Sequence, residues 1–468
     1  MLFHDFAFWP FLATTLLVFY ALPVRIGRHA LALASFFFYA WTDWRFVFLL
    51  AFSILLDWGI GIGIAAASGK RRRWLLASGV AANLVFLGFF KYCDFFLTSV
   101  ATLLGRPPAD YVLGIALPVG ISFFTFHGIS YVVDVFRGHM QPVRSLTDFA
   151  LYMGFFPHLV AGPIVRAHDF VPQIGAWRVP PYEMLQEGAQ LVLLGLVKKV
   201  VFADHFAAVV QTYFDNLAGH PAAGDAWFAM SCFALQIFFD FSGYTDIARG
   251  LAQLFGFRFT LNFARPYLAT NIREFWHRWH ISLSTFLRDY LFIPLGGSRG
   301  SFAATCRNLM LTMLLGGLWH GASWNFVIWG GYHGALLTAH RVLERACAGT
   351  RFGRLVTSRG LWPLWWGANF VLVLIGWVFF RAKSFGDATY VLGAMVSFRG
   401  TGELFTRGLT MAAGVAFVLA LLEERYALFA RLVRAPAWVR VLAWCCGGLV
   451  LELFCAEGGR FPFVYFQF

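Results

Sequence analysis

Histidine and charged side chains interrupt otherwise apolar sequence in two neighbouring segments, NIREFWHRWHISLSTFLRDYLFIPLGG (271–297) and MLLGGLWHGASWNFVIWGGYHG (313–334). Trp, Phe, Leu and Ile surround these polar residues. A charged side chain at the centre of a bilayer costs about 2.5–3.5 kcal/mol even on the scale that gives the smallest penalty. Polar residues kept in such surroundings therefore indicate a functional site inside a membrane protein.

The composition of the whole chain supports this membrane assignment. Of the 468 residues, 59% are hydrophobic and 13% are charged, and the mean hydropathy is +0.66. In a soluble domain about a quarter of the residues are charged. We therefore expect an all-α polytopic membrane protein with about ten to twelve transmembrane helices. A single integral-membrane domain over residues 1–468 accounts for the whole chain.

Apolar windows of spanning length give the candidate helices. They lie near residues 7–22, 30–42, 46–66, 74–91, 112–133, 149–165, 187–210, 226–243, 307–319, 321–340, 361–380, 408–422 and 437–456. The windows 149–165 and 307–319 are too short or too polar to cross a bilayer cleanly. We expect re-entrant or buried helices there, which occur where protein or a water-filled cavity surrounds them.

Basic residues give the orientation. The net charge of +13 is concentrated in expected short loops at 70–73, 341–359 and 425–440, and the positive-inside rule places these loops on the cytoplasmic side of the membrane. Counting spans from them puts both termini outside, although the basic connection 381–407 would then lie outside as well. No nucleic-acid motif accompanies the basic residues, so lipid headgroups are the expected partner and nucleic acid is not.

His320 is the strongest catalytic candidate. It lies in GGLWHGASWN (316–325), between glycines that permit close approach of backbone and tryptophans that exclude water. A neutral imidazole in this setting can take a proton from a hydroxyl group, which is the task of a general base. The alternative is a histidine that only hydrogen-bonds a neighbouring helix.

His280 is a second candidate. It lies three residues after His277 on a helix expected to open after Asn271, and this spacing places both rings on one helical face. Two histidines supply too few ligands for a metal ion, and no Cys, Asp or third His has matching spacing, so no metal site is expected. We expect His280 to assist the base or to bind substrate, and His277 to cap the interfacial end of the helix.

Two further polar groups leave structural and functional roles open. Arg288 and Asp289 precede FIPLGG (292–297). Sequence neighbours do not face each other on a helix, so a pair between these two residues cannot be assumed, and we expect Arg288 to pair within the bundle. Asp240, with its polar neighbours in FFDFSGYTDIA (238–248), ends an apolar span and either lines a cavity or caps the next helix.

Six segments together resemble the membrane-bound O-acyltransferase family, and within it the branch of bacterial alginate O-acetylation proteins. They are PVGISFFTFHGISYVVDVFRG (118–138), FFPHLVAGPIVRAHDFVPQI (155–174), GLVKKVVFAD (195–204), FDFSGYTDIARG (239–250), FWHRWHISLSTFLRDYLFIPLGG (275–297) and MLLGGLWHGASWNFVIWGGYHG (313–334). The resemblance runs from about residue 112 to the C-terminus and is strongest over residues 112–340.

The resemblance implies a ring of tilted helices around a central funnel and an O-acyltransferase activity. Such a protein would pass acetyl groups from a cytoplasmic donor, expected to be acetyl-CoA with no bound cofactor, across the inner membrane for O-acetylation of an extracellular polysaccharide. A periplasmic acetyltransferase would be its partner and would complete the transfer.

The resemblance also implies roles for individual residues. His320 matches the catalytic histidine of the family, and His280 matches the second polar residue at the tunnel. Relatives often carry Arg at the position of His277, so no catalytic role is carried over to it. The substrate-binding candidates are Trp319, Trp324, Asn325, Asp289 and Asp240.

The C-terminal tail, residues 460–468, is unusually aromatic, although exposed termini are ordinarily polar and loose. In relatives, a terminal F-x-Y-x-x-F motif is thought to enter the outer opening and to offer its tyrosine to the acyl group. Phe463, Tyr465 and Phe468 match this motif. The alternative is an aromatic anchor in the headgroup region, where Tyr is enriched.

Two other functions remain open. Within the same family, D-alanyl transfer to teichoic acid uses similar motifs and takes its donor from a carrier protein. In a different class, a membrane transporter without acyl chemistry would use the polar residues only to line a permeation path.

Overall fold

The computed structural model describes residues 1, 3–350, 359–397, 399–404, 414, 418, 431–432, 434–455, 461 and 463, and every element in this part of the chain is helical. The elements are α1 Phe8–Ala21, α2 Val24–Ala40, α3 Arg45–Ala66, α4 Gly69–Leu103, η1 Pro108–Tyr111, α5 Ile121–Arg137, α6 Leu146–Gly154, α7 Phe156–Leu159, α8 Ala167–Gly175, α9 Tyr182–Val197, η2 Lys198–Ala203, α10 Asp204–Asp215, η3 Leu217–Gly219, α11 Ala223–Leu254, η4 Pro266–Leu268, α12 Ile272–Arg278, α13 Ile281–Leu287, η5 Arg288–Phe292, α14 Phe302–His320, α15 Trp324–Cys347, η6 Arg359–Leu361, α17 Trp362–Arg381, α18 Phe385–Val396 and α21 Ala437–Cys455.

Five helices of the described part are long and apolar enough to cross a membrane by length and composition. They are α3, α4, α11, α17 and residues 437–454 of α21. The chain is therefore an all-α polytopic membrane protein. The larger number of spans and the ring around a funnel remain predictions.

Two expectations about helix ends were wrong. The basic run Lys70–Arg73 is not a loop, because it lies in the first turns of α4. The polar cluster around Asp240 does not end a span, because α11 continues unbroken to Leu254. The Asp240 carboxylate is tolerated inside α11 because it has a partner within the protein. Lys199 on η2 donates a hydrogen bond to it at 2.7 Å.

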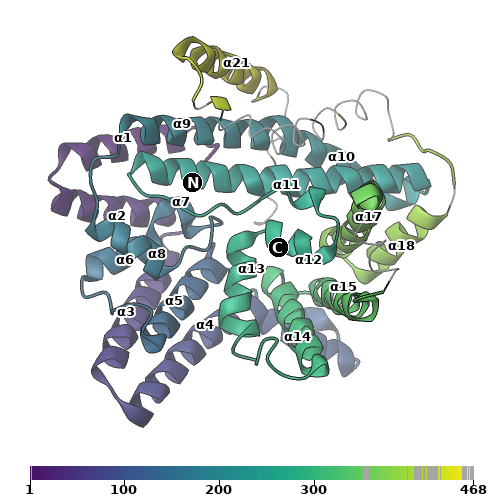
Figure 1. The fold of residues 1–468 in the computed structure, drawn as a ribbon, viewed down its shortest axis with the longest axis horizontal. Coiled ribbons are helices and arrows are strands. Elements are labelled where there is room, and N and C mark those ends of the chain that lie inside the picture. Colours follow the sequence, from purple (N-terminus) through teal and green to yellow (C-terminus); the bar gives the residue numbers. More distant parts are fainter. Residues whose placement is uncertain are drawn as a thin grey trace. The chain divides into compact units, whose positions relative to one another are not determined.

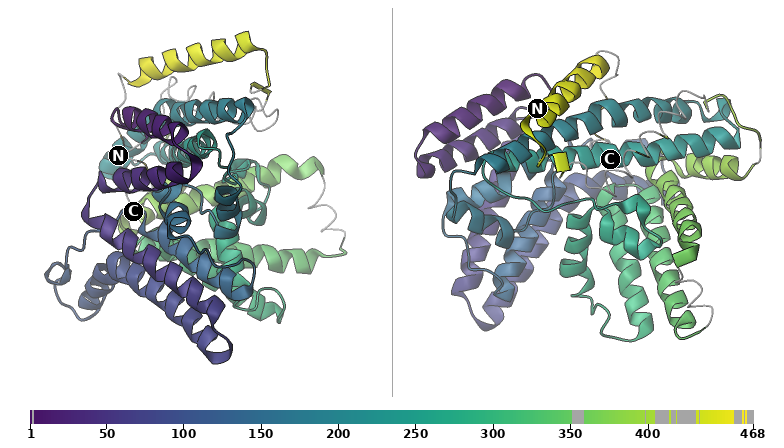
Figure 2. Two further views of the ribbon diagram at one scale, coloured as in Figure 1. Left: turned by 90° about the vertical axis from the view of Figure 1, so that its left-hand side faces the viewer. Right: turned by 45° about the horizontal axis from the view of Figure 1, so that its top comes forward.

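The described chain divides into two compact units, Met1–Val192 with Thr245–Thr260, and Leu193–Tyr244 with Leu261–Phe468. The expectation of a single domain remains a prediction. In the first unit, α3, α4 and α5 pack side by side (Figure 2). They meet around the buried Asp57, which accepts a hydrogen bond from Asn83 at 2.7 Å. Gly128 on α5 faces this carboxylate, where any Cβ would overlap it.

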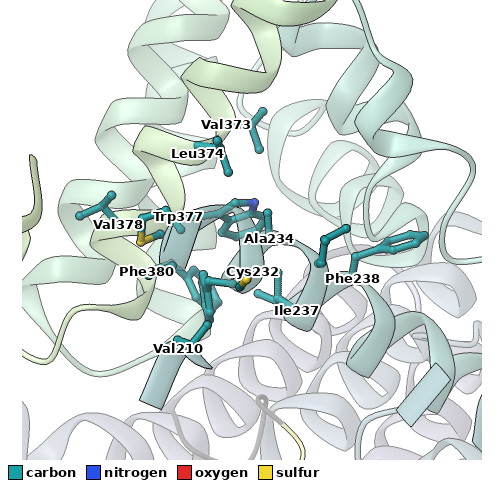
Figure 3. Close-up of a cluster of buried hydrophobic side chains, with 14 of the residues drawn as sticks. Val210, Cys232, Ala234, Ile237, Phe238, Val373, Leu374, Trp377, Val378 and Phe380 are labelled. Atoms are coloured by element: carbon teal, nitrogen blue, oxygen red, sulfur yellow. The ribbon is translucent and has the colours of Figure 1, made fainter. Parts of the chain in front are cut away.

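The core of the second unit joins α10, α11 and α17 through large apolar side chains. Figure 3 shows Val210, Phe238 and Trp377 in this cluster, and all three are buried. Lipid tails are as apolar as these side chains, so van der Waals packing contributes more to their association in a membrane than escape from water does. The candidate site is built on the same unit, so this packing holds its helices in place.

Helices α14 and α15 form an antiparallel pair in the second unit (Figure 1). Glycines make the close approach possible. A Cβ at Gly317 would overlap the carbonyl of Phe326, and a Cβ at Gly330 would overlap the carbonyl of Met313. Small residues at membrane helix interfaces allow backbones to come this near. The glycines around His320 therefore permit close backbone approach, as predicted.

Candidate active site

The segment that carries His280 is two short helices rather than one. Helix α12 begins after Asn271, as predicted, and the Asn271 side chain accepts a hydrogen bond from the Glu274 amide at 2.9 Å. The helix ends at Arg278, and His280 takes a left-handed conformation with φ of 44° before α13 begins. A non-glycine residue in this region costs about 1–2 kcal/mol. The surrounding structure must therefore stabilise the break.

Asn262 provides that stabilisation. Its side-chain oxygen accepts hydrogen bonds from the Ser282 amide at 3.1 Å and from the Ser282 hydroxyl at 2.9 Å, and its backbone carbonyl accepts from the Ile281 amide at 2.9 Å. These bonds satisfy amide donors at the start of α13 that a helix leaves without partners. The prediction that His277 and His280 share one helical face was therefore wrong.

Asn262 also fixes the tautomer of His280. The Nδ1 atom of His280 lies 3.2 Å from the Asn262 side-chain oxygen, which can only accept, so Nδ1 carries the proton and Nε2 is the basic nitrogen. His280 lies outside the five spanning helices and is fully buried, with the Phe241 ring 4.7 Å away. Burial lowers the pKa of His280 to about 3, so the imidazole is neutral at physiological pH.

His320 is the last residue of α14 and stands close to His280, with their ring centroids 6.5 Å apart. Three aromatic rings surround the buried imidazole: Trp319 at 5.0 Å, Trp329 at 5.1 Å and Phe380 at 5.3 Å. The structure thus brings together the two histidines that the sequence singled out. Trp319 forms part of the aromatic wall beside His320, as predicted, but Trp329 and Phe380 complete it in place of Trp324. The exclusion of water remains a prediction.

A pocket of about 320 Å³ opens beside His320. It lies between α12, α13, η5, α14 and α15. Its wall near His320 is apolar and includes Trp329, Met313 and Gly316, and other parts of its lining carry Arg273, His277, Arg288, His340, Arg341 and Glu344. Twelve residues of α15 separate Trp329 from Arg341, which corresponds to roughly 18 Å along a helix. The pocket therefore extends along α15 from an aromatic wall beside His320 to a region rich in basic residues.

Ion pairs order the basic part of the pocket. Glu344 lies 3.5 Å from Arg273 and 3.3 Å from His340, and these side chains are partly exposed. Three arginines and one glutamate line the pocket, which leaves it two formal positive charges in excess at neutral pH. An anionic group on a ligand would be attracted to this region.

The predicted substrate-binding residues divide between the site and its surroundings. The Trp319 ring lies beside both histidine rings, with its centroid 5.0 Å from that of His320 and 6.2 Å from that of His280. Trp324 is 58% exposed and does not line the pocket. Asn325 is buried, and its side chain donates a hydrogen bond to the Ala382 carbonyl at 2.9 Å, so it ties α15 to the end of α17.

Arg288 and Asp289 pair with each other, so the described partner of Arg288 is its neighbour in sequence. The Arg288 Nε donates to Asp289 at 2.6 Å. Both residues lie on η5, which is a π-helical turn. Arg288 lines the pocket and Asp289 stands beside it.

Asp240 contacts Lys199, and Phe463 of the C-terminal motif lies over the same lysine, with the Lys199 nitrogen 4.5 Å from the ring centroid. Tyr465 and Phe468 lie outside the described residues. Within the described part of the chain, no group of three His, Cys, Asp or Glu side chains gathers to hold a metal ion. The expected absence of a metal remains a prediction.

Sequence reasoning missed Asn262, Trp329, Arg273 and Arg341. Trp329 and Arg341 lie twelve residues apart on α15, about a third of a turn away from a whole number of helical turns, so their spacing gave no clear signal that both line one pocket. Arg273 follows the cap of α12 by two residues, so its position beside Glu344 depends on tertiary packing. For Asn262, the one signal in the sequence was a polar residue within an aromatic segment.

Residues 78–381 match the sequence model of the membrane-bound O-acyltransferase family. Similar curated proteins include the probable alginate O-acetylase AlgI of Pseudomonas aeruginosa, 45% identical over 403 residues (84% of this chain and 74% of the relative). The protein of the same name from Azotobacter vinelandii is 43% identical over 394 residues (83% and 76%). A peptidoglycan O-acetyltransferase of Helicobacter pylori is 38% identical over 425 residues (84% and 79%).

Proposed function

The chain belongs to the membrane-bound O-acyltransferase family, and on this premise we propose that it passes acetyl groups from a cytoplasmic thioester donor across the inner membrane to a glycan outside. It is an O-acyltransferase and acts in membrane O-acetylation. Alginate is named for two relatives and peptidoglycan for a third. The proposed acceptor is accordingly an extracellular polysaccharide, alginate or a related glycan.

One observation carries the proposal: His320 stands at the aromatic wall of the pocket with His280 beside it. His320 takes the proton of an acceptor hydroxyl, the hydroxyl oxygen forms a bond to the acyl carbon, and the carbon–sulfur bond of the donor breaks. The proton then passes to the departing thiolate. His280, neutral and fixed by Asn262, orients the reacting groups. The aromatic walls keep water from hydrolysing the thioester.

The basic part of the pocket supports acetyl-CoA as the donor. Coenzyme A carries phosphate groups, and arginine binds phosphate through charge-assisted hydrogen bonds. Arg273 and Arg341 would bind these phosphates while the acyl end extends along α15 to His320. Arg341 also begins one of the basic segments that the positive-inside rule places in the cytoplasm, where acetyl-CoA is made.

The immediate acceptor is proposed to be a hydroxyl that reaches His320 from the outer side, that of Tyr465 or of a periplasmic acetyltransferase. The partner enzyme would then transfer the acetyl group to the polysaccharide.

The central test is His320→Gln at matched membrane abundance. Loss of a positioned general base reduces the rate by roughly 10²–10⁴-fold, so acetate should disappear from the isolated polymer. His333→Gln is the matched control, because His333 is also buried against Trp329, at 4.8 Å, but does not line the pocket. Normal acetate in His320→Gln, or equal loss in both variants, would contradict the catalytic assignment.

The donor is tested with radiolabelled acetyl-CoA and inside-out vesicles. Arg341→Ala and Arg273→Ala should each raise the KM for acetyl-CoA about tenfold, the effect of losing roughly 1.4 kcal/mol of binding. Lys383→Ala removes an exposed positive charge outside the pocket and should leave the KM unchanged. D-alanine esters in place of acetate on the polymer would favour the D-alanyl alternative, and transport without esterification would favour a transporter.

A further inference from the structure

Lys199 is a buried cation that the acyl-transfer chemistry above does not use. It lies on η2, and its ammonium nitrogen has three oxygen atoms within 3.0 Å. It donates to Asp240 at 2.7 Å and to the backbone carbonyl of Phe461 at 3.0 Å, and it forms an ion pair with Asp204 at 2.9 Å. Two of these oxygens belong to carboxylates near the lysine, and the third belongs to the C-terminal segment.

An ammonium group has three N–H donors and accepts nothing. Lys199 donates one hydrogen bond to Asp240 and one to the Phe461 carbonyl, and Asp204 adds an ion pair at 2.9 Å. If that carbonyl left, a donor on a buried cation would lose its partner, which is costly because a charged group without hydrogen bonds is poorly stabilised away from water. The lysine therefore favours the bound position of the C-terminal segment.

The Phe463 ring adds a second, independent contact. Its centroid lies 4.5 Å from the Lys199 nitrogen, within the range of a cation–π interaction, which is strongest where water is absent. The same ring packs edge-on against Tyr244 at 4.7 Å and is only 2% exposed. A backbone carbonyl and a side-chain ring thus hold the segment to the same lysine.

The docking point adjoins the candidate active site through α11. Asp240 precedes Phe241 on this helix, and the Phe241 ring contacts His280 at 4.7 Å. Tyr244 lies one turn further along α11 and carries the contact to Phe463. A single rigid helix therefore connects the anchor of the C-terminal segment with the wall of the histidine site.

We infer that Lys199, paired with Asp204 and Asp240, is the docking point that holds Phe461 and Phe463 of the C-terminal segment beside the acyl-transfer site. Lys199 is a positioning residue: it fixes the segment that Tyr465 follows by two residues, and it touches no reacting atom. The contacts of Phe461 and Phe463 with Lys199 do not depend on the acyl-transfer reaction. Its importance for acetyl transfer rests on the function proposed above, so the two are tested by separate measurements.

The docking is measured by chemical labelling. The reporter is Phe461→Cys, which keeps the backbone carbonyl that binds Lys199 and introduces a thiol. It is placed in a full-length chain whose seven native cysteines are replaced. This background must still acetylate polymer. Reaction with N-ethylmaleimide should accelerate at least about tenfold in Lys199→Met, the order expected when a charge-assisted hydrogen bond is lost. Lys199→Arg retains a cation with donors and should restore much of the protection.

Asp225→Asn is the matched control. Asp225 is also a buried carboxylate on α11, and it accepts hydrogen bonds from the amides of Glu403 and Leu404 rather than from the C-terminal segment. Its loss should leave labelling at position 461 unchanged. Equal acceleration in Asp225→Asn and Lys199→Met would show general loosening of α11 and would overturn the inference.

Phe463→Leu tests the docking from the other side and keeps the Lys199 carboxylate pairs intact, so it remains informative if Lys199→Met fails to insert. It should accelerate labelling and lower polymer acetate at unchanged membrane abundance. Slow labelling in both variants would refute the docking point. Fast labelling with full acetylation would refute its positioning role, whereas loss of acetate only in His320→Gln would leave the catalytic proposal standing alone.

Discussion

His280 owes its place beside His320 to Asn262, a side chain 18 residues upstream. The left-handed backbone of His280 and the start of α13 both depend on hydrogen bonds to this one residue. Spacing rules count positions along a helix and cannot reveal a partner that interrupts the helix from outside. The chemical identity of His280 and His320 was predictable from the sequence, but the geometry that joins them was not.

Removing Asn262 should therefore misplace His280 without deleting it. We expect His280→Ala and Asn262→Ala each to lower acetylation about tenfold to a hundredfold, less than His320→Gln, because small displacements of an orienting group can cost about 10² in rate. Asn369→Ala is the control, because Asn369 is also buried but has a different partner. Its side chain donates a hydrogen bond of 2.9 Å to the Ala269 carbonyl and not to either histidine. Polymer acetate per folded protein is the measurement, and equal loss in Asn369→Ala would show that only stability matters.

The C-terminal tyrosine is tested by removing one oxygen. Tyr465→Phe keeps the ring, so an aromatic anchor in the headgroup region should tolerate it. An acyl acceptor or a specific hydrogen bond should not. We expect Tyr465→Phe and deletion of residues 463–468 to lose acetate to a similar degree. Full activity in Tyr465→Phe with loss only on deletion would support the anchor.

At the scale of elements, the pairing of α14 and α15 determines where His320 points. Four predicted windows match helices within a few residues at both ends, for example 46–66 against α3 and 437–456 against α21, whereas others miss a helix end by several residues or cover more than one helix. The prediction failed where polar residues lie inside a helix, as in α11, because their buried partners, such as Lys199 for Asp240, come from distant sequence. The window 408–422 lies mostly outside the described residues.

Neighbouring glycines on α15 allow a sharp test of the helix pair. A Cβ at Gly330 would overlap the Met313 carbonyl, which is backbone and has little freedom to move, so Gly330→Ala should destabilise the protein by about 1–3 kcal/mol. At Gly331 the nearest atom is a Leu314 methyl at 3.5 Å, which is ordinary contact, so Gly331→Ala should be neutral. Thermal unfolding in detergent measures both, and equal midpoints would contradict the close packing.

At the scale of the whole molecule, charge and hydropathy predicted a polytopic helical membrane protein, and the described helices agree. Orientation depends on the positive-inside rule alone. Because α4 is a candidate span, Ser68 before it and Asp110 in η1 after it should lie on opposite sides of the membrane.

A pair of cysteines tests this orientation. Ser68→Cys and Asp110→Cys are both at exposed positions and are labelled with an impermeant maleimide in intact cells. We expect Asp110→Cys to react from outside and Ser68→Cys to react only after permeabilisation. The reverse pattern would invert the topology and would move the basic part of the pocket away from the cytoplasmic donor.

The aromatic enclosure of His320 bears on which acyl groups the proposed reaction would accept. Rings of Trp319, Trp329 and Phe380 pack against the imidazole, with centroids 5.0–5.3 Å from it, and the pocket of about 320 Å³ opens on another side of the same ring. In an apolar site, one methylene changes the specificity constant by about 10–200-fold. Under the proposed function, the apolar lining of this pocket at Met313, Gly316 and Trp329 would determine which of the cell's acyl thioesters decorate the outer glycan.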